Sequence, residues 1–203
     1  MIVVLSGHDG SGKTYTATLL DQIFKKKGLK TKHVSFKGYF FVDWFIKLLR
    51  AGYFDNSHKR TYKELKTTNP IYYLWPYIVF VLDYIYYLCV IIPCSYNHII
   101  IVDRFFIDRI VGFYYFGYLS SFGYRMLLWL SPKTKHSFIL QCNAELALER
   151  ETDEKHKISF YQEMHNLYLE IGVRYNHVMV DSSNDIKLII TEILESLHNG
   201  YHK

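Results

Sequence analysis

Five short apolar runs recur along the chain, and each is too brief to form a helix. They lie at residues 2–5, 33–36, 99–102, 138–141 and 178–180. Most of them lack the alternation of apolar and polar residues that marks a half-buried strand. Continuous apolar runs of this length are typical of strands covered on both faces. The pattern therefore predicts a buried, mostly parallel sheet of five strands.

Longer segments with helical periodicity lie between these runs. The expected helices cover residues 13–27, 39–50, 76–92, 120–130, 144–151, 159–175 and 185–197. Strands that alternate with helices are typical of an α/β fold, in which helices flank a parallel sheet. Residues 55–69 are polar and weakly periodic, which predicts a loop or a short insertion. Because there is neither an internal repeat nor a low-complexity linker, we expect one domain over residues 1–203.

One apolar segment, residues 71–92, carries Asp83 as its single charge, and hydropathy alone would assign it as a transmembrane helix. If Pro76 begins the helix and Pro93 follows its end, the helix is only about 24 Å long, against a hydrocarbon core of about 30 Å. A span would also place two of the predicted strands on opposite sides of a bilayer. We therefore expect a buried core helix, with peripheral membrane contact as the less favoured alternative.

A phosphate-binding pattern, GxxxxGK[ST], lies between the first predicted strand and the first predicted helix. Its glycines let backbone N–H groups turn toward a phosphate chain, and the start of the helix adds its positive dipole end. Lys13 can reach the β- and γ-phosphates of ATP, and the Thr14 hydroxyl can bind Mg²⁺. The expected ATP-binding residues are Gly7, Asp9, Gly10, Ser11, Gly12, Lys13 and Thr14. The alternative is a chance glycine-rich turn, which the flanking strand and helix disfavour.

The run 99–102 ends in an acid, Asp103, and four aliphatic residues followed by an acid form a Walker B pattern. Its carboxylate can hold Mg²⁺ directly or through water, together with Thr14. Because ligands of open α/β sheets bind at the carboxyl ends of the strands, Asp103 is expected beside the glycine-rich loop. The alternative is that Asp103 caps the next helix.

Arg104 follows this acid directly. A guanidinium group at the end of the strand can clamp an acceptor phosphate through two N–H groups. The alternative is an ion pair of Arg104 with Asp108 or Asp103.

These residues resemble those of the thymidylate kinase family of P-loop nucleoside monophosphate kinases, in order over nearly the whole chain. The specific matches are the loop GxDGSGKT, with an acid at Asp9, and the sequence Asp103-Arg104-Phe105. Three further segments support the resemblance: residues 132–133 and 144–150, on either side of the fourth strand, and residues 178–183, at the last strand. The middle of the chain is also similar to a divergent branch of thymidylate kinase-like proteins.

The resemblance implies Mg²⁺-dependent transfer of the γ-phosphoryl group of ATP to a nucleoside monophosphate, with dTMP as the leading acceptor. It assigns catalysis to Lys13, Arg104 and Arg150, the last in a short lid at about residues 150–158. It places Asp9 near the acceptor's sugar and Phe80 on the base. The implied acceptor site comprises Asp9, Lys37, Phe80, Tyr84 and Arg104. The family also implies a homodimer formed through helices beside the sheet, which the aromatic residues of segment 77–87 would suit.

Three positions depart from the family pattern. Lys37 lies in the segment where the family has an Arg that binds the acceptor phosphate, Tyr84 replaces an Arg that reads the thymine edge, and no further Arg follows Arg150 in the lid. Phe80 is also a plain core aromatic on an apolar helix. These departures motivate two alternatives: a kinase of another small acceptor, such as a nucleoside or a phosphorylated metabolite, and a non-catalytic ATP-binding interaction module.

Composition narrows the classes of protein further. Apolar residues make up 50% of the chain, which excludes overall disorder, and a net charge of +5 suits an anionic substrate. No long basic stripe indicates a nucleic-acid partner. The chain has three cysteines, Cys89, Cys94 and Cys142, and no CxxC pair. An odd number without such a pair argues against a zinc site and against a disulfide scaffold. Without a signal-peptide pattern, the expected location is cytoplasmic. His8, within the loop, either contacts a phosphate or fills an unconstrained position.

Overall fold

The centre of the protein is a parallel sheet. The computed structural model describes residues 1–35, 71–151 and 156–199. The strands are β1 (Ile2–Ser6), β2 (Thr31–Ser35), β3 (Ile99–Asp103), β4 (His136–Gln141) and β5 (Val178–Asp181), in the order β2-β3-β1-β4-β5. Every neighbouring pair is parallel. All five predicted strands are confirmed, and their ends lie within two residues of the predicted ones.

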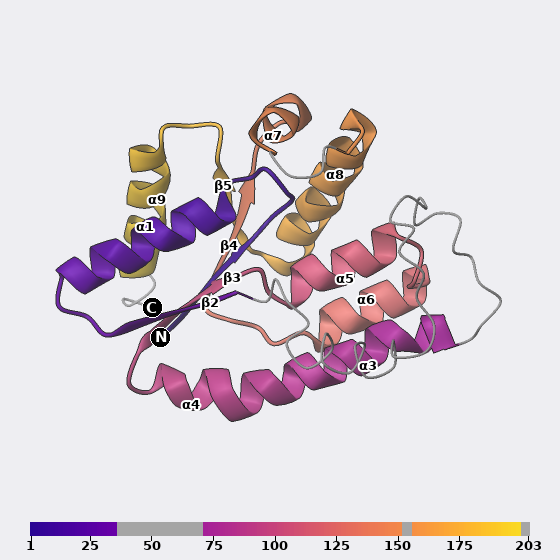
Figure 1. The fold of residues 1–203 in the computed structure, drawn as a ribbon, viewed down its shortest axis with the longest axis horizontal. Coiled ribbons are helices and arrows are strands. Elements are labelled where there is room, and N and C mark those ends of the chain that lie inside the picture. The colour runs from indigo at the N-terminus through magenta and orange to yellow at the C-terminus, as the bar shows by residue number, and fades with distance from the viewer. Residues whose placement is uncertain (36–70, 152–155, 200–203) are drawn as a thin grey trace, which may run out of the picture.

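Helices cover both faces of this sheet (Figure 1). On one face α1 (Lys13–Lys26) and α9 (Ile186–Asn199) enclose a mostly aliphatic core with the inner side chains of the strands. On the other face a larger core is shared by further helices, and α7 sits beyond the end of β4. These helices are α3 (Ile71–Tyr86), α5 (Phe106–Tyr115), α6 (Ser121–Leu130), α7 (Ala144–Arg150) and α8 (Ile158–Tyr175). The predicted α/β class is confirmed.

The apolar segment between β2 and β3 differs from the prediction. Helix α3 begins at Ile71, so Pro76 lies inside it, and the helix continues through a π-helical turn, η2 (Tyr87–Ile91), into α4 (Ile92–Ser95). Proline removes one helical hydrogen bond but does not end this helix, because its ring is buried against the protein. The expected helix start at Pro76 and end before Pro93 were therefore wrong.

The expectation of a buried core helix holds for one face of α3 only. Val79, Phe80, Tyr87 and Ile91 belong to the core, whereas a row of aliphatic side chains on the same helix faces outward. Within the described residues, one helical stretch, Tyr73–Ser95, is long and apolar enough to cross a membrane, and 22% of its most apolar window is buried. Length and composition alone are weak evidence of a span.

Helix α5 was missing from the predicted set. Its sequence, FIDRIVGFYY, is dominated by aromatic and β-branched residues of modest helix propensity, and tertiary packing of its buried face overrides that preference. The predicted helix at 39–50 and the predicted loop at 55–69 lie outside the described residues. Beyond these segments, each predicted helix has a counterpart in the structure.

Candidate functional site

The loop between β1 and α1 lies at the carboxyl edge of the sheet and packs closely against the end of β4 and against α7. Gly7 and Gly10 both have positive φ, at 147° and 77°. A Cβ atom on Gly7 would overlap the carbonyl oxygen of Leu140, at the end of β4, and one on Gly10 would overlap the backbone of Ala147 in α7. Because both positions exclude a side chain on conformational and steric grounds, the loop can approach β4 and α7 only with glycine there.

Lys13 is folded into this loop. Its Nζ donates to the carbonyl oxygen of His8 at 2.5 Å and to Oγ of Ser11 at 3.3 Å, and its side chain is almost fully buried. Burial lowers the pKa of Lys13, although the carboxylates of Asp108 and Asp9 oppose that shift. A buried ammonium held only by a carbonyl and a hydroxyl oxygen is a strong donor for an incoming phosphate oxygen.

Thr14 and Asp103 meet as the two motifs predicted. The Thr14 hydroxyl donates to Oδ2 of Asp103 at 2.7 Å, and the Asp103 carboxyl group is fully buried. Its other oxygen, Oδ1, has no hydrogen-bond partner in the part of the chain that the structure describes. Buried carboxylate oxygens are normally paired, so this oxygen is suited to a cation or its bound water.

A magnesium ion fits this pair only as part of a larger ligand set. Among the described residues there is no group of three His, Cys, Asp or Glu side chains that could hold a metal ion. Mg²⁺ commonly takes one or two protein oxygens and completes its octahedron with water and substrate phosphates. Thr14 and Asp103 are therefore the residues that would hold Mg²⁺ with a nucleotide, and the binding itself stays a prediction.

Arg104 stands in a strained backbone conformation at the end of β3. Its φ of 66° is unusual for a residue with a side chain, and its N–H donates to the carbonyl of Leu5 at 3.0 Å. Nη2 forms an ion pair with Oδ1 of Asp9, not with Asp103 or Asp108 as the alternative reading required. Nε is buried without a partner among the described residues, so Arg104 retains a donor for an anion.

The ion pair perturbs both of its members. Burial raises the pKa of the Asp9 carboxyl group, but Arg104 and Lys13 lower it more, and the net pKa lies below its usual range. Burial likewise lowers the pKa of Arg104, and Asp9 and Asp108 more than offset this. Both side chains are therefore charged near neutral pH, and an acceptor phosphate would compete with Asp9 for Arg104.

Asp108, in the first turn of α5, links the loop to two helices. Its Oδ1 accepts hydrogen bonds from the N–H of Gly7 at 3.0 Å and from the hydroxyl of Tyr168 at 2.9 Å. Its Oδ2 accepts from the N–H of Phe105 at 2.7 Å. Sequence reasoning gave Asp108 no role beyond a possible ion pair with Arg104, because no motif marks it. The signal present was an acid three residues into a helix, a common capping position.

His8 faces inward rather than toward a phosphate. Its side chain is 1% exposed, with Nδ1 2.8 Å from the carbonyl oxygen of Asp9 and Nε2 3.5 Å from the backbone N of Cys142. Nε2 also lies 3.1 Å from the carbonyl oxygen of Cys142, so the donor and acceptor roles of the two ring nitrogens depend on the tautomer. Burial lowers the pKa of His8, as does the charge of Lys13. The position is therefore constrained: His8 ties the loop to the end of β4.

The remaining predicted site residues make no hydrogen bond, ion pair or ring contact with Lys13, Asp103 or Arg104 among the described residues. Nη1 of Arg150 donates to the carbonyl of Ser182 at 3.0 Å, which holds this side chain at the loop after β5. Phe80 and Tyr84 pack against Phe106 within the core. Lys37 lies outside the described residues, as do residues 152–155 of the predicted lid. The roles of all four stay predictions.

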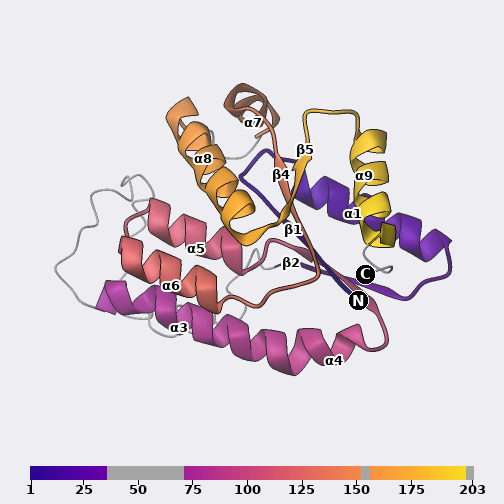
Figure 2. The same cartoon turned by 180° about the vertical axis from the view of Figure 1, so that it is seen from behind.

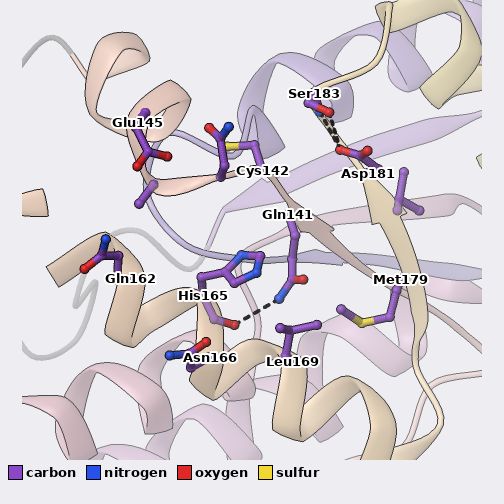
Figure 3. Close-up of a pocket in the computed structure, with 13 residues that line it drawn as sticks. Gln141, Cys142, Glu145, Gln162, His165, Asn166, Leu169, Met179, Asp181 and Ser183 are labelled. Atoms are coloured by element: carbon purple, nitrogen blue, oxygen red, sulfur yellow. Dashed lines mark hydrogen bonds between the residues drawn. The ribbon is translucent and has the colours of Figure 1, made fainter. Parts of the chain in front are cut away.

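A cavity of about 770 Å³ opens beside this site, between α7, α8 and the ends of β4 and β5 (Figure 3). Gln141, Gln162, His165 and Asn166 give it a polar wall, and none of the predicted site residues lines it. The His165 ring meets the His8 ring edge to face, with centroids 6.0 Å apart. Because its lining includes acids but neither Lys nor Arg, the cavity is poorly suited to a phosphate chain.

Comparison with known proteins supports the fold. No protein-family model matches the chain, and no curated protein matches it in sequence. Among solved structures, a thymidylate kinase from Ehrlichia chaffeensis superposes with a TM-score of 0.61 at 16% sequence identity. The alignment covers 97% of this chain and 98% of that one. The chain therefore has the P-loop α/β fold of thymidylate kinase, with its five-stranded parallel sheet and flanking helices.

The Asp108 contacts predict a defect in the loop when the carboxylate is replaced. Asp108→Asn keeps the shape but replaces one carboxylate oxygen with an NH2 group, so at least one of three donors loses its acceptor and we expect the free energy of unfolding to fall by about 1–3 kcal/mol. We also expect weaker ATP binding, because either orientation of the amide breaks the link that Asp108 makes between Gly7 and the start of α5. Tyr168→Phe, which removes one donor and leaves both backbone bonds, is the matched control. Equal loss of ATP affinity in the two variants would contradict the positioning role.

Burial of neutral His8 predicts a pH dependence of stability. Because its pKa in the folded protein lies below the ordinary 6.5, the unfolded chain binds its proton first, and stability is lost as pH falls below about 6.5. His8→Gln should therefore flatten the slope of unfolding free energy between about pH 7 and pH 5. Chemical denaturation across this range measures it, with exposed His33→Gln as the control. An unchanged slope in His8→Gln would refute the assignment.

Proposed function

We propose that this protein is an ATP- and Mg²⁺-dependent phosphotransferase, and that a nucleoside monophosphate, with dTMP as the leading candidate, is its acceptor. The observation that carries the proposal is the convergence of three groups at the carboxyl edge of the sheet. These are the buried ammonium of Lys13, the Thr14–Asp103 pair and Arg104. In the part of the chain that the structure describes, one oxygen of Asp103 and Nε of Arg104 have no hydrogen-bond partner. The thymidylate kinase fold supports it.

Phosphoryl transfer needs positioning and charge stabilisation more than covalent chemistry. The N–H groups of the Gly10–Thr14 stretch would bind the phosphates, while Lys13 exchanges the His8 carbonyl and the Ser11 hydroxyl for a phosphate oxygen. Bound Mg²⁺, held by Thr14 and Asp103, would neutralise charge on the β- and γ-phosphates. Because Lys13 is almost fully buried, its charge acts in a low-dielectric surrounding, where its attraction to a phosphate oxygen is stronger than in water.

The Arg104–Asp9 pair suits an acceptor that carries a phosphate. A phosphate dianion can displace the carboxylate from Arg104 and also engage the unpaired Nε. The freed Asp9 carboxylate would then accept a hydroxyl hydrogen from the acceptor's sugar. Arg150 would contact the transferring phosphate only after it breaks its hydrogen bond to the carbonyl of Ser182. Such a rearrangement would accompany closure of the lid.

A second acceptor class is favoured by the packing around Phe80. The void bordered by Phe80, Asp83, Phe106 and Arg109 measures about 10 Å³, too little to hold more than a water molecule. Burial raises the pKa of Asp83 to about 6, because its ion pair with Arg109 at 3.2 Å offsets only part of that effect. Phe80 is 9% exposed, so its ring offers a nucleobase little surface in this conformation, and a phosphorylated metabolite without a base is the alternative acceptor.

We also propose that the protein acts in the cytoplasm and forms a homodimer. Cys89, Cys94 and Cys142 are all free, as suits a reducing compartment. The dimer rests on the family resemblance. The tyrosines that motivated it are partly used elsewhere: Tyr84 and Tyr87 pack edge to face with Phe106 inside the subunit. Their rings therefore do not mark the dimer surface.

The proposed activity predicts acceptor-dependent release of ADP. In a coupled assay with Mg-ATP, dTMP, dUMP, dCMP, dGMP, AMP and thymidine are offered separately. We expect dTMP-dependent release of ADP, at a higher rate than with any of the others. Lys13→Ala should lower kcat/KM by at least about a hundredfold, since it removes a charge used in the transition state. Turnover only with a base-free phosphorylated metabolite would select the second acceptor class. ATP binding without turnover of any acceptor would favour a non-catalytic module.

Dimerisation predicts a molar mass in light scattering of twice the 24.2 kDa of the chain. The expected species is monodisperse at micromolar concentrations of protein. A single species at monomer mass would refute the dimer, and it would leave the proposed kinase activity untouched.

A further inference from the structure

The cavity between α7, α8 and the ends of β4 and β5 is large enough to hold a small molecule. Its volume of about 770 Å³ lies within the range of ligand sites, about 300–1,000 Å³. Helix α8 approaches β5 closely at Gly172, where an added Cβ would overlap Sδ of Met179. Nearer its N-terminal end, α8 lines the cavity with residues at intervals of three and four: Gln162, His165, Asn166 and Leu169. These positions share one face of the helix, so the cavity is bounded by regular structure.

Two side chains stand between the cavity and the glycine-rich loop. Cys142 lines the cavity, and its Sγ lies 3.8 Å from the carbonyl oxygen of Gly10. His165 also lines the cavity, and its ring contacts the ring of His8. Nδ1 of His165 is buried and has no hydrogen-bond partner among the described residues. Buried polar nitrogens are normally paired, so this atom is suited to a ligand or to a bound water.

The cavity also lies on the opposite face of the sheet from α1, the helix that begins at Lys13. Met179 and Cys142, in the lining, pack with the core that α8 covers, whereas α1 and α9 enclose the other core. Both ribbon views show α8 and α9 on opposite sides of β4 and β5 (Figure 2). The cavity is therefore a candidate site for a ligand other than a nucleotide held by Lys13.

The charges of the lining exclude several classes of ligand. Two acids, Glu145 and Asp181, and neither Lys nor Arg line the cavity, which disfavours phosphates and carboxylates. The acids are also stabilised within the fold. Oδ1 of Asp181 accepts from the N–H and the hydroxyl of Ser183 at 2.9 Å and 2.6 Å, and Glu145 lies in the first turn of α7, where the helix dipole favours it. Neither acid requires a cationic ligand, so an uncharged ligand is favoured.

The polar wall matches the edge of a nucleobase. The side-chain amides of Gln141, Gln162 and Asn166 each offer a donor and an acceptor, and nucleobases present adjacent donors and acceptors along their edges. Nε2 of Gln141 donates to the carbonyl of His165 at 3.2 Å, a bond that crosses from β4 to α8 (Figure 3). This bond orients the Gln141 amide before any ligand arrives, which lowers the entropic cost of binding.

Another part of the lining is apolar and suits the face of a planar ring. It comprises Ala144, Leu169, Met179 and Val180. A thioether such as that of Met179 packs favourably against aromatic rings. A polyol would use the amides but would leave this apolar surface without a matching group, so it is the weaker candidate.

We propose that this cavity binds an uncharged nucleoside, with its base between the amides of Gln141, Gln162 and Asn166 and the side chain of Met179. The nucleoside and a nucleotide at the glycine-rich loop would occupy separate places. The inference does not rest on the proposed phosphotransferase activity.

The test is methyl NMR of the full-length protein with isotopically labelled methionine ε-methyl groups. The chain has four methionines, of which Met179 lines the cavity, while Met1, Met126 and Met164 report on other places. The spectrum of Met179→Leu identifies the Met179 signal. Adenosine, guanosine, cytidine and uridine are titrated separately, with and without Mg²⁺ and a non-hydrolysable ATP analogue. Ribose and the corresponding monophosphates are the ligand controls.

A pair of variants separates the cavity from the rest of the surface. The cavity variant combines Gln162→Leu and Asn166→Leu, which keeps side-chain size and removes two amides. The matched control combines Gln22→Leu and Asn97→Leu, two exposed amides outside the lining. Circular dichroism and thermal unfolding check that both variants are folded.

We expect at least one nucleoside to shift the Met179 signal with a Kd below about 1 mM, whether or not the ATP analogue is present. The cavity variant should weaken this binding by at least about tenfold, because each lost amide removes hydrogen bonds to the base, and the control should not. The monophosphate should perturb Met179 with an affinity lower by about tenfold or more, and ribose should leave the signal unchanged.

Four results would overturn the proposal. The first is that no nucleoside shifts Met179 at concentrations of several times 1 mM, roughly the weak limit of specific binding. The second is equal affinity in the cavity variant and its control. The third is a shift by ribose as strong as that by any nucleoside, which would exclude recognition of the base. The fourth is displacement of the nucleoside by the ATP analogue, which would assign the cavity to the nucleotide site. Failure of the analogue to bind would count against the proposed function and leave the titrations without it decisive here.

Discussion

The site depends on how closely the loop at residues 7–14 approaches the structure around it. Gly7 touches the backbone at the end of β4, and Gly10 touches α7, where a single Cβ would force the chains apart. The Asp108 carboxylate completes this contact, because one side chain accepts hydrogen bonds from the loop, from the start of α5 and from Tyr168 in α8. Backbone sterics and one buried carboxylate thus fix the loop relative to both faces of the sheet.

This placement explains the charge arrangement of the site. With the loop held at the carboxyl edge, Thr14 reaches Asp103 and Asp9 reaches Arg104, although each pair is about 90 residues apart in sequence. Lys13 is buried among these carboxylates and keeps its own hydrogen bonds within the loop. The result is a compact set of opposite charges in which two polar atoms, Oδ1 of Asp103 and Nε of Arg104, have no hydrogen-bond partner among the described residues. A metal-bound nucleotide and an acceptor phosphate are the ligands that complement them.

Sequence patterns predicted the strands and the Thr14–Asp103 contact, because apolar runs and short phosphate-binding motifs are local signals. They could not reveal the Asp9–Arg104 pair, the inward His8 or the role of Asp108, which depend on side chains brought together by the tertiary fold. The start of α3 was misplaced for a related reason. Proline is a strong local signal, but tertiary packing holds a helix through Pro76 and leaves an aliphatic face exposed.

The central claim is that this loop and Asp103 bind ATP as its magnesium complex. Calorimetric titration of ATP into the wild type and Thr14→Val, each with Mg²⁺ and with EDTA, tests it most directly. Thr14→Val removes the hydroxyl ligand and keeps the side chain's shape. The account predicts that Mg²⁺ tightens ATP binding to the wild type by about tenfold or more, and that this gain largely disappears in the variant. ATP binding to the wild type that is equally tight in EDTA would contradict it.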